Sequence, residues 1–214
     1  MSAGSRAASS RQGWWGIAFA VLLLIGAGMV SVPTADDPAA KIVAFYQAHT
    51  SIVLVAEVVG ILALVPLVLF IRALAQRSSD AAHSRRLMGV AVLVVVTELA
   101  TNVPPVVLAL ASNPSPSSAH AWTFAVDLAD ATLFAALGLL ALLAIRQQMG
   151  WFRWFGIGVA ALCFAQAVGS PLGLTALDAI APSAFLLFVA ALSAWMLRTR
   201  PDKVAAPPQQ APAA

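Results

Sequence analysis

Charged residues are scarce in this chain, and their scarcity excludes an ordinary water-soluble fold. Lys, Arg, Asp and Glu make up 10% of the 214 residues, whereas soluble domains carry about 25%. Hydrophobic residues make up 61%, and the mean hydropathy is +0.89. A chain of this length cannot hide so much apolar surface from water. We therefore expect the lipid bilayer to be its solvent.

Cysteine is almost absent, which excludes several kinds of site. The single Cys163 can form neither an intrachain disulfide nor a Cys-x-x-Cys metal or redox site. The chain also lacks the G-x-S-x-G, H-E-x-x-H and P-loop patterns. With three scattered His residues, haem and zinc sites have no spacing motif to support them. We expect no cofactor, no metal and no enzymatic activity, although an intramembrane enzyme acting on a lipid stays open as an alternative.

Six apolar runs dominate the sequence, and each approaches the roughly 20 residues that a membrane-spanning helix needs. The runs cover residues 14–32, 50–71, 87–111, 121–145, 152–170 and 176–197. They predict an all-α, polytopic membrane helix bundle with six transmembrane helices over residues 13–199. The flanking tails, 1–12 and 200–214, are rich in small or polar residues and Pro, which predicts disorder.

The basic residues fall almost entirely on one side of this pattern. Eleven of the twelve Lys and Arg residues lie in alternate connections and the two tails, and only Lys41 lies on the other side. By the positive-inside rule, both termini are expected in the cytoplasm. Heavy Arg and Ala usage favours a bacterial chain, and hence the bacterial cytoplasmic (inner) membrane. The basic residues form no patch, so nucleic acid is not an expected partner.

The segment after the first run has the pattern of a short amphipathic helix. Asp37 suits an N-cap and Pro38 the first helical position. Ile42, Phe45 and Tyr46 then follow at helical spacing on one face. We expect a helix lying on the membrane surface, with Tyr46 at headgroup depth, that runs on into the second span.

Carboxylates lie inside the predicted spans, although no Lys or Arg lies there to neutralise them. The buried acids are Glu57, Glu98, Asp127 and Asp130, and Asp178 lies near the outer boundary. An ionised Asp at the centre of a spanning helix costs about 2.5–3.5 kcal/mol on insertion scales. These groups are therefore expected either to be protonated or to line a hydrated pocket that binds a cation.

Polar neighbours strengthen the expectation of a pocket. Glu98, Thr101 and Asn102 share one helical face, and Pro104–Pro105 is expected to break the helix and free backbone carbonyls for a ligand. Thr101 is a secondary candidate, as are Gln166 in the fifth run and His49 and His120, which lie just outside the second and fourth runs. One hypothesis is a binding or transport module with an outward-facing acidic pocket for a proton, cation or small amine. The alternative is a non-catalytic accessory or scaffold subunit with a membrane-protein partner, in which these groups bond helices together.

Residues 32–77 contain a set of features: Pro33, Asp37-Pro38, Ile42, Phe45-Tyr46 and His49, followed by an apolar run that ends in Phe70-Ile71-Arg72. In these features the segment resembles a family of bacterial six-helix integral membrane proteins whose function is not established. The resemblance implies a six-helix membrane protein and transfers no functional residue to this chain.

Overall fold

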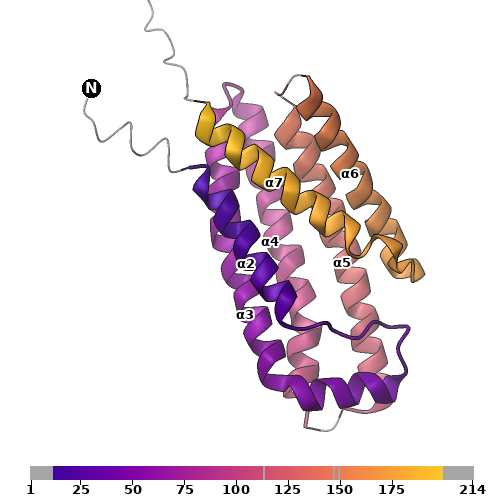
Figure 1. Ribbon diagram of the computed structural model, residues 1–214. Helices are drawn as coiled ribbons and strands as arrows, with labels where there is room; N and C mark the ends of the chain where they lie inside the picture. Colours follow the sequence, from indigo (N-terminus) through magenta and orange to yellow (C-terminus); the bar gives the residue numbers. More distant parts are fainter. Residues whose placement is uncertain (1–11, 113, 147, 149, 200–214) are drawn as a thin grey trace, which may run out of the picture.

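The computed structural model describes residues 12–112, 114–146, 148 and 150–199, and these residues fold into an all-α bundle (Figure 1). The helices are α2 (Trp14–Met29), α3 (Ala39–Arg77), α4 (Ala81–Leu110), α5 (Pro116–Ile145), α6 (Trp151–Gly169) and α7 (Ile180–Arg198). Two short 3-10 turns, η1 (Ser170–Leu172) and η2 (Thr175–Leu177), connect α6 to α7. The predicted all-α fold class is confirmed, while the predicted tails lie outside the described residues except for Gln12.

Five of the helices, α3 to α7, are long and apolar enough to cross a membrane when η1 is counted with α6. The first, α2, has 16 residues and stops at Met29, before the predicted end of its apolar run at residue 32. Gly26 and Gly28 weaken its last turn, and the backbone is extended at Val30. The six helices therefore differ in length, which matters for the site below.

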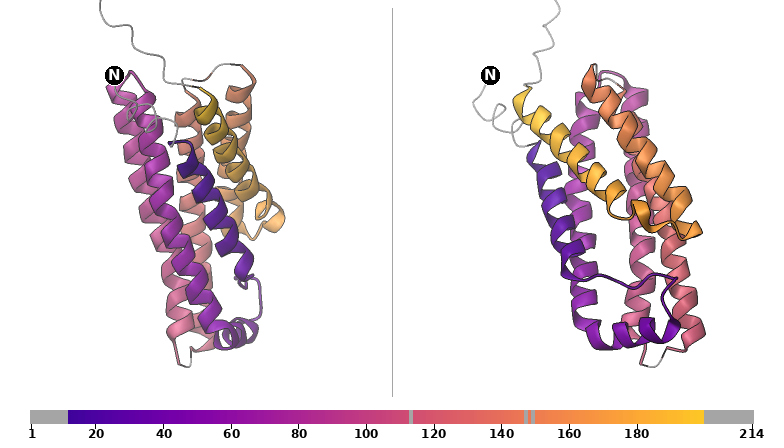
Figure 2. Two further views of the ribbon diagram at one scale, coloured as in Figure 1. Left: turned by 60° about the vertical axis from the view of Figure 1, so that its left-hand side comes forward. Right: turned by 45° about the vertical axis from the view of Figure 1, so that its right-hand side comes forward.

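The helices form a closed ring in which each packs against the next along the chain. The last helix, α7, packs against both α6 and α2, so the first and last helices close the bundle. Two further views show the same arrangement, with α7 slanted across the face between α2 and α6 (Figures 1 and 2). A ring of this kind encloses space that side chains from every helix can reach.

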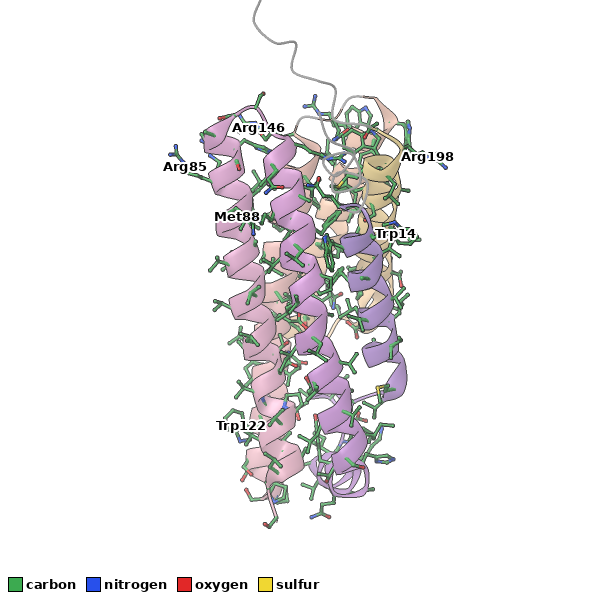
Figure 3. The ribbon with its side chains drawn as sticks, turned by 90° about the vertical axis from the view of Figure 1, so that its left-hand side faces the viewer. Trp14, Arg85, Met88, Trp122, Arg146 and Arg198 are labelled. Carbon is green, nitrogen blue, oxygen red and sulfur yellow. The ribbon has the colours of Figure 1, made fainter. Side chains whose placement is uncertain are left out.

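Arginine side chains gather at one end of the bundle, here named the basic end. Arg85, Arg146 and Arg198 lie at this end, and Trp122 lies toward the opposite one (Figure 3). Arg77 also joins two helices there, because its Nη2 donates a hydrogen bond of 2.9 Å to the backbone oxygen of Met196. The sequence pattern of alternating basic connections thus becomes a physical segregation of charge.

The N-terminal part of α3 forms an arm that crosses the ends of α4 and α5. A non-helical backbone at His49 (φ −121°, ψ 17°) separates this arm, residues 39–48, from the rest of α3. Ile42 and Tyr46 are 0% and 2% exposed and pack with Leu108 of α4 and Ala119 of α5. The predicted helix that continues into the second span is confirmed. The ends of α4 and α5 cover the Tyr46 ring, and its placement at headgroup depth stays a prediction.

Two glycines allow close contacts between the short helices and their neighbours. A Cβ added at Gly16 of α2 would overlap Ser193 of α7 and lie 2.9 Å from the Phe70 ring of α3. A Cβ at Gly156 of α6 would overlap Ile145 of α5 and lie 3.1 Å from the ring of Phe188 in α7. Small residues allow this kind of approach between membrane helices.

Candidate functional site

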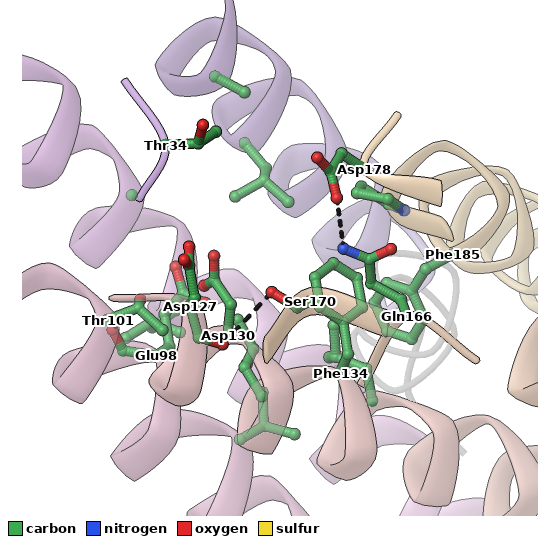
Figure 4. Close-up of a pocket in the computed structure, with 18 of the residues that line it drawn as sticks. Thr34, Glu98, Thr101, Asp127, Asp130, Phe134, Gln166, Ser170, Asp178 and Phe185 are labelled. Atoms are coloured by element: carbon green, nitrogen blue, oxygen red, sulfur yellow. Dashed lines mark hydrogen bonds between the residues drawn. The ribbon is translucent and has the colours of Figure 1, made fainter. Parts of the chain in front are cut away.

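A cavity of about 350 Å³ lies inside the ring of helices, and all six helices contribute to its lining (Figure 4). Five carboxylates line it. They are Asp36 from the α2–α3 loop, Glu98 from α4, Asp127 and Asp130 from α5, and Asp178 from the connection between η2 and α7. Among the described residues, no Lys, Arg or His lines this cavity. The cavity is therefore acidic, with no basic side chain in its wall to balance the carboxylates.

Helical periodicity explains the inner pair of acids on α5. Asp127 and Asp130 are three residues apart and so project from one face of the helix. A hydrogen bond of 3.3 Å from Ser170 Oγ to the backbone oxygen of Asp127 joins this face to the end of α6. Figure 4 shows Glu98 of α4 next to the same two acids, although α4 and α5 are separate spans. The cluster therefore depends on the packing of several helices.

Gln166 of α6 lines the cavity beside Asp178. Its Nε2 donates a 2.7 Å hydrogen bond to Asp178 Oδ1, which the close-up marks with a dashed line (Figure 4). The side chain is only 3% exposed, and its Oε1 accepts no hydrogen bond from any described residue. A buried acceptor without a donor is unusual in a folded protein and calls for an explanation.

The loop between α2 and α3 places Asp36 and Asp37 in different surroundings. Asp37 accepts hydrogen bonds from Lys41 Nζ (2.6 Å) and from the Thr34 backbone N–H (3.1 Å). These contacts, that of Lys41 first, lower the pKa of Asp37 below its ordinary value. Asp36 instead lines the cavity and lies against Gly173, where a Cβ would come within 3.2 Å of Asp36 Oδ2. Gly173 has φ of +70°, which favours glycine at this close approach.

The polar face predicted on α4 divides between the cavity and a helix contact. Glu98 and Thr101 line the cavity. Asn102 is 5% exposed and lies toward Gly60 of α3, outside the lining. Thr101 Oγ1 and Asn102 Nδ2 both donate to the backbone oxygen of Glu98, at 2.8 and 2.6 Å.

The expected break at Pro104–Pro105 does not occur. Both prolines are buried, and α4 continues to Leu110. Packing against neighbouring helices stabilises a spanning helix that carries proline. The proline pair therefore gives α4 no gap in which its backbone faces the cavity.

The remaining predicted candidates lie outside the lining. Glu57 of α3 does not line the cavity, although it is close enough to interact electrostatically with Glu98 and Asp130. His49 and His120 are exposed, and the His49 ring stacks on Phe45 with their centroids 4.7 Å apart. The structure thus brings together Glu98, Thr101, Asp127, Asp130 and Gln166 from the predicted set.

Two acids of the lining, Asp36 and Asp178, lie in connections rather than in spans, so the search for intramembrane carboxylates does not select them. Their signal in the sequence is position, because both connections lie on the weakly basic side of the apolar pattern. Within the described residues, no group of three or more His, Cys, Asp or Glu is placed to hold a metal ion. The carboxylates are distributed around a cavity, an arrangement that suits a positively charged ligand larger than a single metal ion.

Comparison of the chain with protein-family models, with curated proteins and with solved structures gives no significant match. Inference about function therefore rests on the chemistry of the residues that line the cavity. That chemistry is the attraction of positive charge by fixed acids in a low-dielectric surrounding, where electrostatic interactions are stronger than in water.

Proposed function

We propose that this protein is a small membrane-embedded binding and transport module that takes up a proton, a cation or a small amine. One observation carries the proposal: five carboxylates from four separate elements line a single cavity that no described basic side chain lines. Acids inside membrane proteins are costly and commonly mark the paths of ions or protons. Acids that served only to join helices would be expected at separate contacts rather than around one cavity.

The proposal includes a location and an orientation. The one-sided distribution of Lys and Arg supports a bacterial cytoplasmic membrane with both termini in the cytoplasm. The loops that contribute Asp36 and Asp178 lie at the ends of their helices remote from the basic end. In this orientation the cavity opens to the outside, and its negative charge attracts cations from that side.

The acids of the cavity lie at two depths along the bundle, and together they provide a path for a cation. Asp36 and Asp178 come from loops, whereas Glu98 and Asp130 come from helix interiors. A cation attracted by the loop acids moves inward to Glu98 and Asp130, where the lower dielectric strengthens its attraction to a carboxylate. Protonation of the inner acids weakens that attraction and releases the cation, so proton and cation compete for the same site.

Uptake into proteoliposomes tests this function, with Asp130→Asn as the main variant. We expect the loss of one inner carboxylate to reduce cation or proton flux by about tenfold or more. Asp80→Asn is the matched control, because Asp80 caps α4 at the basic end by accepting a 2.8 Å hydrogen bond from Ala82 N–H. Asn caps helices as well as Asp does, so the fold is retained.

Equal flux in wild type, Asp130→Asn and empty vesicles would reject a transport role. A stable protein partner recovered in mild detergent would then favour the accessory-subunit alternative. Reduced flux in both variants alike would point to general damage rather than to the cavity acids.

A further inference from the structure

The cavity changes from acidic to apolar along the bundle axis. On α5, Asp127 and Asp130 are followed on the same face by Phe134 and Leu137, and all four residues line the cavity. From Asp127 to Leu137 is ten residues, or about 15 Å along a helix at 1.5 Å per residue. The apolar part lies toward the basic end, so the cavity has an acidic mouth and an apolar floor.

Other helices repeat this order. On α7 and its preceding connection, Asp178 is followed by Phe185, and on α4 the residue toward the basic end from Glu98 is Val94. Leu64 of α3 also lines the cavity. We name as the apolar floor the residues Leu64, Val94, Phe134, Leu137 and Phe185. Because four helices supply these residues, the gradient is a property of the whole cavity.

A proton or an inorganic cation uses only the mouth. The apolar floor offers such a ligand no polar group to bind. If that space stays empty, the side chains that line it lose dispersion contacts that a larger ligand would make. A volume of about 350 Å³ is at the low end of the range of pockets that bind drug-sized organic molecules, about 300–1,000 Å³. Size and polarity together favour a ligand with a positive head and an apolar body.

The acids of the mouth favour a head that donates hydrogen bonds. Carboxylates accept charge-assisted hydrogen bonds from an ammonium N–H group, and a quaternary ammonium has none to donate. Gln166 of α6 lines the cavity beside these acids, and its Nε2 already donates to Asp178 Oδ1. Its buried Oε1 points away from Glu98, Asp127 and Asp130 (Figure 4), so these three acids are the acceptors for the ligand.

We propose that the cavity binds amphiphilic primary or secondary amines. The protonated amine lies among Asp127, Asp130 and Glu98, and its alkyl chain or ring packs on the apolar floor. This inference rests on the proposed function and narrows its ligand from any cation to one chemical class.

A series of alkylammonium ions tests the floor. Binding of methyl-, butyl- and hexylammonium to the protein in lipid nanodiscs is measured by calorimetry, with empty nanodiscs subtracted to remove partitioning into lipid. We expect affinity to rise about threefold to fourfold for each added methylene until the floor is filled. Leu137→Phe shortens the floor, so it shifts the optimum to a shorter amine. Leu187→Phe, at a position that is 65% exposed and outside the lining, is the matched control and keeps the optimum of wild type. An optimum that stays at the same chain length in Leu137→Phe overturns the inference.

A series of head groups tests the mouth. Hexyltrimethylammonium is expected to bind about tenfold more weakly than hexylammonium, since it cannot donate hydrogen bonds to Asp127, Asp130 and Glu98. Hexanoate is expected not to bind, because the mouth is acidic. In Asp130→Asn, which removes one of these carboxylates, the preference for the primary over the quaternary ammonium becomes smaller, whereas Asp80→Asn at the basic end leaves it unchanged.

The possible failures are distinguishable. Equal affinity for methyl- and hexylammonium, or binding of inorganic cations alone, overturns the amphiphilic-amine inference and leaves the proposed cation uptake standing. Absence of both cation binding and flux overturns the inference and the proposed function together.

Discussion

The long helices and the short helices of this bundle do different work. The long half consists of α3, α4 and α5, with 39, 30 and 30 residues, and the short half of α2, α6 and α7, with 16, 19 and 19. Where the short helices stop, the chain continues as loops that face the flanks of the long ones. The acidic mouth forms at this level, with inner acids from long helices and outer acids from loops. Unequal helix length thus allows two loops to contribute Asp36 and Asp178 to the cavity.

The largest predicted effect comes from removing the aromatic contact within the short half. Phe188 of α7 is 2% exposed, and its ring stacks on Phe152 of α6 at 5.7 Å. Phe188→Ala should lower the free energy of unfolding by about 3–5 kcal/mol, because it leaves an unfilled space between α6 and α7. The neighbouring Leu187 is 65% exposed, so Leu187→Ala should change little.

Cys163 provides the measurement for this comparison. It is the single cysteine of the chain and 0% exposed, so a thiol-reactive fluorophore labels it only when the bundle opens. Melting curves recorded with this probe should shift for Phe188→Ala and not for Leu187→Ala. Equal shifts would show that the short half is not held by its buried aromatic rings.

The next effect concerns the contact of the short half with the long half. Gly156→Ala places a methyl group against Ile145 of α5 and should destabilise the bundle by about 1–3 kcal/mol through overpacking. Gly158, two residues along the same helix, has nothing within 4 Å of its added Cβ. Gly158→Ala should be neutral or stabilise by up to about 1 kcal/mol, because Ala is the better helix former. A destabilisation of the same size in both would contradict the close contact at Gly156.

A smaller, local effect is expected at the tip of the long half. Ile42→Ala removes a buried contact of the α3 arm with α4 and α5, so the arm opens while the rest of the bundle stays folded. Cleavage by trypsin after Lys41 should accelerate about tenfold or more, with little change in melting temperature. Gln47→Ala, at an exposed position of the same arm, should leave the cleavage rate unchanged. A large fall in melting temperature would instead show that the arm and bundle unfold together.

The smallest predicted effect is a loss of stability at low pH in the α2–α3 loop, which carries Asp36 and Asp37. Contacts with Lys41 and Thr34 lower the pKa of Asp37 in the folded protein. The stabilisation that Asp37 gives the loop is therefore complete above the unfolded pKa of about 3.9 and is lost as the pH falls through the lower folded pKa. Hydrogen exchange at the Thr34 amide, corrected for its intrinsic rate, should show this loss in wild type. Asp37→Asn should abolish the acid dependence; a variant that retained it would refute the assignment to Asp37.

The sequence was sufficient to predict where the helices lie and which polar residues share one face of a helix. The apolar runs predicted six helices, and three-residue spacing placed Asp127 and Asp130 on one face. Periodicity reports the rotation of residues about one helix axis and carries no information on how one helix is rotated against another. It therefore could not tell that Glu98 lines the cavity while Asn102, four residues away, lies toward α3.

The parts that failed or were missed depended on tertiary packing. The arm of α3 has a helical pattern in the sequence, but the surface that covers Tyr46 comes from α4 and α5. The proline pair in α4 predicted a break by local rules, and the neighbouring helices overrode them. Asp36 and Asp178 lie in loops, where no periodic pattern indicates the direction of a side chain.

The closed ring has a consequence for biosynthesis. The cavity wall begins with Phe19 of α2 and is completed by Phe185 of α7, so the pocket cannot form until the ribosome has delivered the last helix. Until then, the acids of α4 and α5 enter the membrane without the wall that encloses them. A chain truncated before α7 should therefore be degraded by membrane proteases faster than the full chain, because its acids lack the wall that α7 completes. Assembly of the whole protein therefore depends on α7 packing against both α2 and α6.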